Sequence, residues 1–212
     1  LRRMKARILV WLVALFCCHN VLFAQKEFVN ASARLSGHPR ILLQKGEEKA
    51  LKKVIMKNAV WKDIHQSLVD EAGEIVKLPL NERIKTGRRL LSVSRENLRR
   101  IFILSYAYRM TGKNEFLKRA ESEMLKAASF SDWNPSHFLD VGEMTMALAI
   151  GYDWLYPQLS VQTKKEIENA IVEKGLKPSF DERYNWFVNA VHNWSQVCHA
   201  GVTYGALAIW EK

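Results

Sequence analysis

Side chains able to do chemistry concentrate near the end of this 212-residue sequence, in the stretch 192–201 that reads HNWSQVCHAG. Eight successive positions hold two imidazoles, two amides, a hydroxyl and a thiol: His192, Asn193, Ser195, Gln196, Cys198 and His199. Apolar stretches on both sides indicate a packed scaffold, in which polar groups find hydrogen-bond partners or line a cavity for a polar ligand. Two interpretations stay open: a ligand-binding segment, or a helix N-terminus capped by Asn193 or Ser195.

A second polar and aromatic group lies in 132–143, which reads DWNPSHFLDVGE. Asp140 and Glu143 are three residues apart where a helix is expected to begin, near the positive end of its dipole. One interpretation is that they are ordinary first-turn acids. In the functional alternative, Trp133 and His137 form a wall that stacks on a sugar and hydrogen-bonds to it.

Other chemistries are not favoured by the spacing of these residues. His192 and His199 are seven apart with no carboxylate between them, so no metal site is predicted, and no cofactor. A thiol nucleophile is disfavoured because Cys198 and His199 are adjacent, and adjacent helical residues point in different directions. His65, on the apolar stripe of an expected helix, is interpreted as a packed or half-exposed histidine rather than a ligand.

Residues 1–24 have the pattern of a signal peptide. Four basic residues precede an apolar run, 8–16, that is too short to span a membrane, and the segment ends in the small residue Ala24. We therefore expect a periplasmic or secreted mature protein that has no membrane attachment after signal cleavage. An uncleaved membrane anchor is the competing interpretation.

The charge of the mature chain is consistent with an acidic ligand. Of 32 Lys and Arg residues, the four in 1–24 are lost on cleavage, which leaves 28 against 22 acids and a net charge of about +6. Nucleic acid is not predicted as a partner, because no dense basic stripe is interleaved with aromatic residues. Cys198 is the single cysteine after residue 24, so no intramolecular disulfide is expected.

The remaining sequence predicts an all-α protein. An irregular segment, 25–44, leads into helical periodicity from Gly46 onward, and no convincing period-two run is present. Cap signals are expected at Ser94, Asn114 and Ser160, with Gly112 as a C-cap. About seven or eight helices with short connections favour antiparallel helical hairpins.

Three segments resemble a known family: 138–144 (FLDVGEM), 149–156 (AIGYDWLY) and 192–198 (HNWSQVC). In this order they look like the helical N-terminal domain of heparinase II/III-like polysaccharide lyases, and they are similar to alginate lyases of related fold. The resemblance implies an (α/α) toroid, of which 45–212 is the N-terminal part. In the family, β-sandwich-like sheets follow the toroid.

The resemblance also implies a reaction, β-elimination at a uronic acid of heparin-like glycans or alginate. His192 matches the family's groove histidine, and Asn193 stands where relatives have an amide that binds the substrate carboxylate. Both are predicted as catalytic, by neutralising that carboxylate. Trp133, His137, Trp194 and Gln196 are predicted as substrate-binding residues, with an acidic polysaccharide as the partner.

The sequence departs from the family in one respect. The usual acid/base tyrosine lies in a later helix and a further histidine lies beyond the toroid, whereas this sequence ends at Lys212. We therefore expect a lyase fragment, inactive without the C-terminal toroid helices and the β-sheet domain. The alternatives are a non-catalytic helical module that binds acidic carbohydrate, and an (α/α) glycoside hydrolase that uses Asp140 and Glu143.

Overall fold

The computed structural model describes residues 37–211, and every regular element in that range is helical. The α-helices are α2 (Glu48–Lys57), α3 (Ala59–Lys77), α4 (Leu91–Thr111), α5 (Asn114–Ala128), α6 (Phe138–Leu155), α7 (Val161–Ala170) and α8 (Asn193–Ala208). Short helical turns at Ile171–Leu176, Lys177–Phe180 and Asn185–Asn189 connect α7 to α8. The predicted all-α class is confirmed for the described residues.

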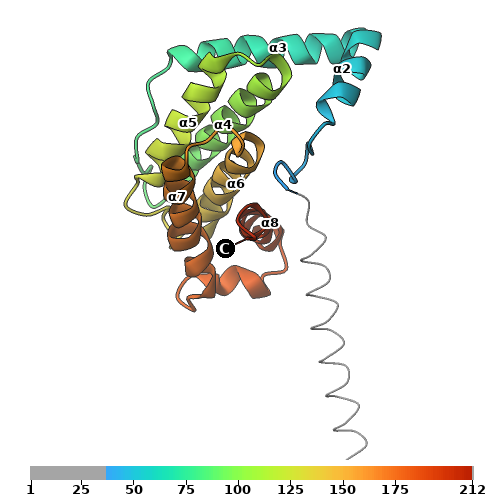
Figure 1. The fold of residues 1–212 in the computed structure, drawn as a ribbon. Coiled ribbons are helices and arrows are strands. Elements are labelled where there is room, and N and C mark those ends of the chain that lie inside the picture. The colour runs from blue at the N-terminus through green and yellow to red at the C-terminus, as the bar shows by residue number, and fades with distance from the viewer. Residues whose placement is uncertain (1–36, 212) are drawn as a thin grey trace, which may run out of the picture. The chain divides into compact units, whose positions relative to one another are not determined.

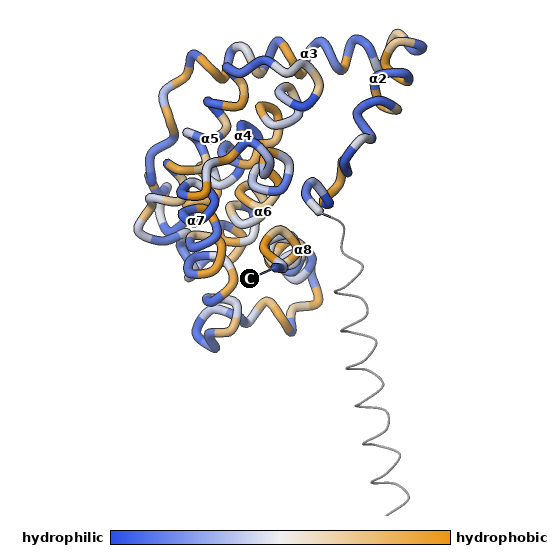
Figure 2. The backbone as a smooth tube through the Cα atoms, in the orientation of Figure 1, coloured by the Kyte–Doolittle hydropathy of each residue, from blue (hydrophilic) through white to orange (hydrophobic). Residues whose placement is uncertain are grey.

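Helix α6 is the centre of the fold. Sixteen of its eighteen residues are buried, which is the expected state of a helix that is hydrophobic on all sides. Helices α4 and α8 pack against it, and α3 crosses the ends of α4 and α5 (Figure 1). Each large apolar side chain buried in this way contributes about 1.5–3 kcal/mol. By contrast, α2 and α3 alternate between hydrophilic and hydrophobic residues along their length (Figure 2).

Two glycines bring α6 and α8 into close contact. A Cβ atom on Gly201 of α8 would lie 2.1 Å from the carbonyl oxygen of Gly142 on α6. A Cβ on Gly142 would lie 3.2 Å from the Cα of Cys198. The backbones therefore touch near the beginning of α6, and this contact fixes where the N-terminus of α8 lies.

Of the four expected cap signals, two are found at the predicted residues and two are not. Ser160 caps α7 by accepting a hydrogen bond from the Thr163 amide at 3.0 Å, and Gly112 ends α4 with a φ of +73°. The prediction that Ser94 opens its helix is wrong, because α4 begins at Leu91 and the Ser94 side chain is buried inside it. The N-cap position of α5 is Lys113, not Asn114.

The irregular segment before α2 is fixed to the far end of α6. The buried Asp153 carboxylate accepts hydrogen bonds from the backbone amides of Arg40 (2.9 Å) and Ile41 (2.8 Å), and it pairs with Nδ1 of His38 at 2.6 Å. Trp154 donates its indole N–H to the Ile41 carbonyl. These contacts explain why the stretch 149–156 is rich in polar and aromatic groups although it is buried.

The predicted signal peptide lies outside the described residues. Among the helices that are described, none combines the length and the apolar character that crossing a membrane requires.

Candidate functional site

The centre of the candidate site is the carboxylate of Asp140, in the first turn of α6. It is fully buried, and its Oδ2 accepts hydrogen bonds from the Leu90 amide and from the Asn134 side chain, both at 2.6 Å. Its Oδ1 lies 2.7 Å from Nδ1 of His137. Three donors, one from the segment before α4 and two from the loop before α6, therefore satisfy one buried carboxylate.

Asn134 holds an uncommon backbone conformation at this point, with a φ of +59°. Asparagine tolerates the left-handed region better than other residues with a Cβ atom. Its amide N–H bonds to the Asp132 carboxylate at 2.6 Å, and its side-chain NH₂ also reaches the Arg88 carbonyl at 2.8 Å. Hydrogen bonds from the backbone amide of Asn134 and from its side chain therefore hold the loop before α6 in one shape.

His137 connects this network to α8 through an aromatic contact. The ring is buried, and because Nδ1 donates to Asp140, Nε2 is the nitrogen left unprotonated in the neutral ring. Its centroid lies 4.7 Å from that of Trp194, in an edge-to-face arrangement. Trp194 in turn packs against Trp186, whose centroid is 4.8 Å away and which is 47% exposed. Trp186 and Trp194 together form an aromatic wall.

The N-terminus of α8 presents polar side chains beside this wall. His192 is the N-cap: its Nδ1 accepts a long hydrogen bond, 3.4 Å, from the Trp194 amide, so a neutral ring carries its proton on Nε2. Neither Asn193 nor Ser195 caps the helix. Asn193 and Gln196 are exposed, and their side chains make no hydrogen bond to any described residue.

The structure brings together five of the six predicted site residues. His192, Asn193, Trp194 and Gln196 lie in the first turn of α8 or at its cap, and His137 lies behind Trp194. Trp133 is elsewhere: it is fully buried, and its indole N–H bonds to the Ala127 carbonyl at 3.0 Å. This burial leaves no ring face on which a sugar could stack, so Trp133 is dropped from the proposed substrate contacts.

Cys198 is a packing residue. Burial raises the pKa of its thiol to about 12, and the charge of Glu143 adds to this rise, so the thiol is protonated at neutral pH. His199, the adjacent imidazole, instead bonds through Nδ1 to the Ser195 carbonyl one turn earlier, at 2.7 Å. A thiolate nucleophile at this position has no structural support.

Trp186 and Asn134 complete the wall and the buried network. The sequence placed both among polar and aromatic residues near helix starts, but it assigned neither an individual role. Trp186 lies six residues before His192, in a short helical turn that carries no strong pattern of its own. The signal for Asn134 was the neighbouring Asp132 and Pro135, a composition typical of a structured turn.

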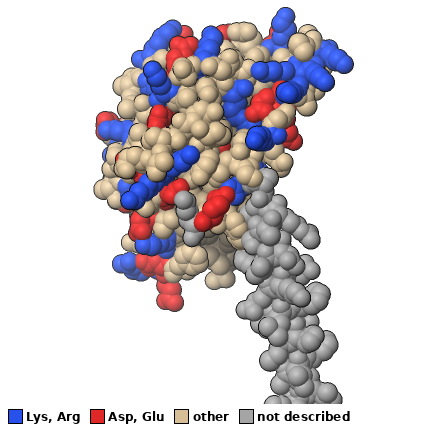
Figure 3. Space-filling view, in the orientation of Figure 1, with Lys and Arg blue, Asp and Glu red and all other residues tan. Residues whose placement is uncertain are grey.

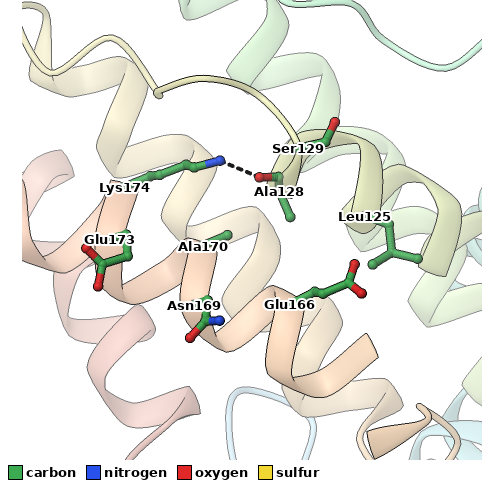
Figure 4. Close-up of a pocket in the computed structure, with 8 residues that line it drawn as sticks. All are labelled: Leu125, Ala128, Ser129, Glu166, Asn169, Ala170, Glu173 and Lys174. Atoms are coloured by element: carbon green, nitrogen blue, oxygen red, sulfur yellow. Dashed lines mark hydrogen bonds between the residues drawn. The ribbon is translucent and has the colours of Figure 1, made fainter. Parts of the chain in front are cut away.

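A separate pocket, between α5 and α7, has a structural explanation. It has a volume of about 260 Å³ and is lined by Glu166, Glu173 and Lys174 among others (Figure 4). Lys174 donates hydrogen bonds to the carbonyls of Ala128 and Phe130, at the C-terminal end of α5. Burial lowers the pKa of Lys174, but the amine is occupied as a helix C-cap.

Neither a family model nor a curated protein sequence matches this chain. Within residues 37–211, no group of three or more His, Cys, Asp or Glu side chains is placed to hold a metal ion.

Proposed function

We propose that this chain supplies the substrate-binding half of a lyase that cleaves uronic-acid polysaccharides by β-elimination, within a partial (α/α) toroid of helical hairpins. The observation that carries the proposal is the exposed N-terminus of α8, where His192 and Asn193 flank a wall of Trp186 and Trp194. A helix N-terminus attracts anions, and exposed tryptophan rings stack on sugars. An exported location, periplasmic or secreted, belongs to the same proposal.

In the proposed reaction, the uronate carboxylate lies at the positive end of α8. The Nε2–H of His192 and the side-chain amide of Asn193 donate hydrogen bonds to it, which reduces the cost of the negative charge that develops as the C5 proton leaves. A base takes that proton, the C4–O4 bond breaks, and a C4=C5 double bond forms. The departing oxygen takes a proton from an acid, which the family resemblance assigns to a tyrosine of a later helix.

The buried network has a positioning role in this proposal. Asp140 orients His137, and His137 supports the inner edge of Trp194, so the wall keeps its place when a sugar binds. The glycoside hydrolase alternative receives no support from this arrangement. It needs two carboxylates open to the substrate, whereas Asp140 is fully buried with three hydrogen bonds and Glu143 pairs with Arg95 at 3.1 Å.

The test is a product assay on the protein translated from its complete reading frame. Heparin, heparan sulfate and alginate are each incubated with the enzyme, and the ultraviolet absorbance of the new unsaturated uronate is followed. We expect product from at least one polysaccharide, and a fall in kcat of about 10²–10³-fold for His192→Ala, as for loss of one oxyanion donor. Asn193→Ala should lower kcat in the same way.

The matched control is His199→Ala, which removes an exposed histidine from the same helix. Its kcat should stay within about twofold of the wild type, because its Nδ1 bonds within α8. An enzyme without product on every uronic polysaccharide contradicts the lyase proposal. If it still binds the acidic chains, the non-catalytic carbohydrate-binding module takes its place, since that function needs only the wall and Asn193.

A further inference from the structure

A pocket rich in arginine lies where the loop before α4 meets the beginning of that helix. It has a volume of about 460 Å³ and is lined by Thr86, Arg88, Arg89, Leu91, Ser92 and Arg95. Thr86 and Arg89 pair through two backbone hydrogen bonds, at 2.8 and 3.2 Å, around a turn. Gly87 has a φ of +60° in that turn, a conformation that glycine adopts without strain. The turn therefore holds both arginines beside the helix.

Two of the three arginines in this pocket lack an anionic partner among the described residues. Among the described residues, the guanidinium groups of Arg88 and Arg89 make no ion pair or hydrogen bond, and both residues are exposed. Arg95 pairs with Glu143, yet its side chain remains 63% exposed. By contrast, most arginines on the neighbouring turns of α4 are paired, as Arg99 and Arg100 are with Glu96.

The beginning of α4 adds further donors to the pocket. The helix has no side-chain cap and no acidic residue in its first turn, and the amide N–H groups of Leu91 and Ser92 meet no acceptor among the described residues. Arginines at the positive end of a helix dipole are unfavourable unless an anion lies between them. The pocket therefore presents two unpaired guanidinium groups and two free backbone amides, all of which can donate hydrogen bonds to an anion.

Two contacts connect this pocket to the candidate site through the first two turns of α6. Leu90, next to the pocket, donates its amide to the same Asp140 carboxylate that orients His137. Arg95 of the pocket bonds Glu143, which lies one turn further along α6. The pocket is therefore built on the same element as the support of the aromatic wall. Figure 3 shows basic and acidic side chains intermixed on one face of the molecule.

We propose that this arginine pocket is an anion subsite that holds a sulfate or carboxylate group of the acidic polysaccharide, a step that rests on the proposed function. Arginine's planar fork matches both oxyanions by paired hydrogen bonds. A polysaccharide carries such groups at regular intervals, so one chain engages the subsite with one residue and the α8 site with another. The subsite contributes to affinity and takes no part in bond cleavage.

The test is calorimetric titration of the full protein with a heparin-derived hexasaccharide. We expect Arg88→Gln/Arg89→Gln to weaken binding by about tenfold or more, since two charge-assisted contacts are lost. The control, Lys52→Gln/Lys53→Gln, removes the same charge from exposed positions of α2 and should change Kd by less than about twofold. Amide resonances of Leu91 and Ser92 should shift on titration of the wild type and stay in place in the arginine variant.

Further arms identify the anion and the class of ligand. The same titration is repeated with a desulfated hexasaccharide of the same length. If it binds as tightly and depends on the arginines in the same way, the subsite holds a carboxylate. If binding is lost, the subsite holds a sulfate. Equal weakening in both double variants overturns the proposal, because it shows a general charge effect. Equally tight, arginine-dependent binding of a DNA duplex also overturns it, in favour of a phosphate site.

The same variants separate this proposal from the lyase function. If Arg88→Gln/Arg89→Gln binds like the wild type while His192→Ala loses turnover, the subsite is refuted and the lyase proposal stands. If the arginine variant loses binding but no uronic polysaccharide yields unsaturated product, the subsite stands and the lyase proposal fails.

Discussion

At the scale of single residues, Asp140 shows how one buried charge can fix several segments at once. Its carboxylate joins the loop before α4, the loop before α6 and the ring of His137. From the sequence, Asp140 was interpreted as an acid in the first turn of a helix or, in the glycoside hydrolase alternative, as one of two catalytic carboxylates. The interpretation as a simple first-turn acid had the position right but not the role, because the three donors come from 50, 6 and 3 residues away.

We expect Asp140→Ala to lower the free energy of unfolding by about 3 kcal/mol or more, because it leaves three buried donors without an acceptor. The measurement is urea denaturation followed by circular dichroism. Asp70→Ala is the control: Asp70 is exposed and accepts one bond from Gln66, so its loss should cost less than about 0.5 kcal/mol. Equal stability losses in the two variants would refute the role of Asp140.

The tryptophans also have roles that the local sequence does not reveal. Sequence alone did not separate Trp133, which is fully buried, from Trp186, which is half exposed. Both lie next to polar residues in the connections that precede helices α6 and α8. Burial is decided by which helices pack over each loop, and that is a property of the tertiary fold.

At the scale of elements, the crossing of α6 and α8 is set by glycine. We expect Gly201→Ala to lower the free energy of unfolding by about 3 kcal/mol, because its Cβ would overlap the Gly142 carbonyl. Gly73 provides an opposite control in the interior of α3, where a Cβ would meet no atom within 4 Å. Gly73→Ala should stabilise by about 0.5–1 kcal/mol. Thermal denaturation that shows both changes with the same sign would contradict this account of the crossing.

The helices themselves were largely predictable, since apolar periodicity and caps such as Ser160 are local signals. The residues at which the helices begin and end were less predictable. Helix α4 begins three residues before Ser94 because tertiary contacts, including the Leu90 amide on Asp140, extend it. Helix α8 is capped by His192, and histidine is not among the residues generally preferred at the N-cap position.

At the scale of the whole molecule, salt bridges make the free energy of unfolding depend on pH. The pKa values of Glu48, Glu96, Asp132 and Glu211 are all lowered. For Glu48, burial raises the pKa, but the hydrogen bonds and charge of Arg109, together with the backbone amides of Gly46 and Glu48, outweigh it. For Glu96, the hydrogen bond from Arg99 is the largest cause of the lowered pKa. Carboxyls with a lowered pKa in the folded state contribute stability above their unfolded pKa, and this stability is lost as the pH falls through the folded value.

We therefore expect Tm to be nearly constant above the ordinary glutamate pKa of 4.5 and to fall steadily below it. Differential scanning calorimetry between about pH 3 and about pH 7 measures this. Glu48→Gln should lower Tm at neutral pH and reduce the slope below the ordinary pKa, because one of the linked protons is gone. A Tm that is the same at both ends of the range would contradict the linkage.

The absence of period-two runs was enough to predict the all-α class. The arrangement of the site residues could not be predicted from the sequence. One of the segments that carry the resemblance holds His192, Asn193 and Trp194, but only the fold shows that Trp186 and His137 pack against this segment. The arginine pocket was equally hidden. Thr86 to Arg95 reads as a loop and a helix start, and nothing local marks the guanidinium groups as unpaired.

The central claim, β-elimination at the α8 site, is tested most directly by the masses of the products. The protein from the complete reading frame is incubated with one defined acidic oligosaccharide, and all fragments are weighed by mass spectrometry. Elimination adds no water, so the account predicts fragment pairs whose summed mass equals that of the substrate, and their loss in His192→Ala. Fragment pairs heavier than the substrate by one water would show hydrolysis and contradict the account.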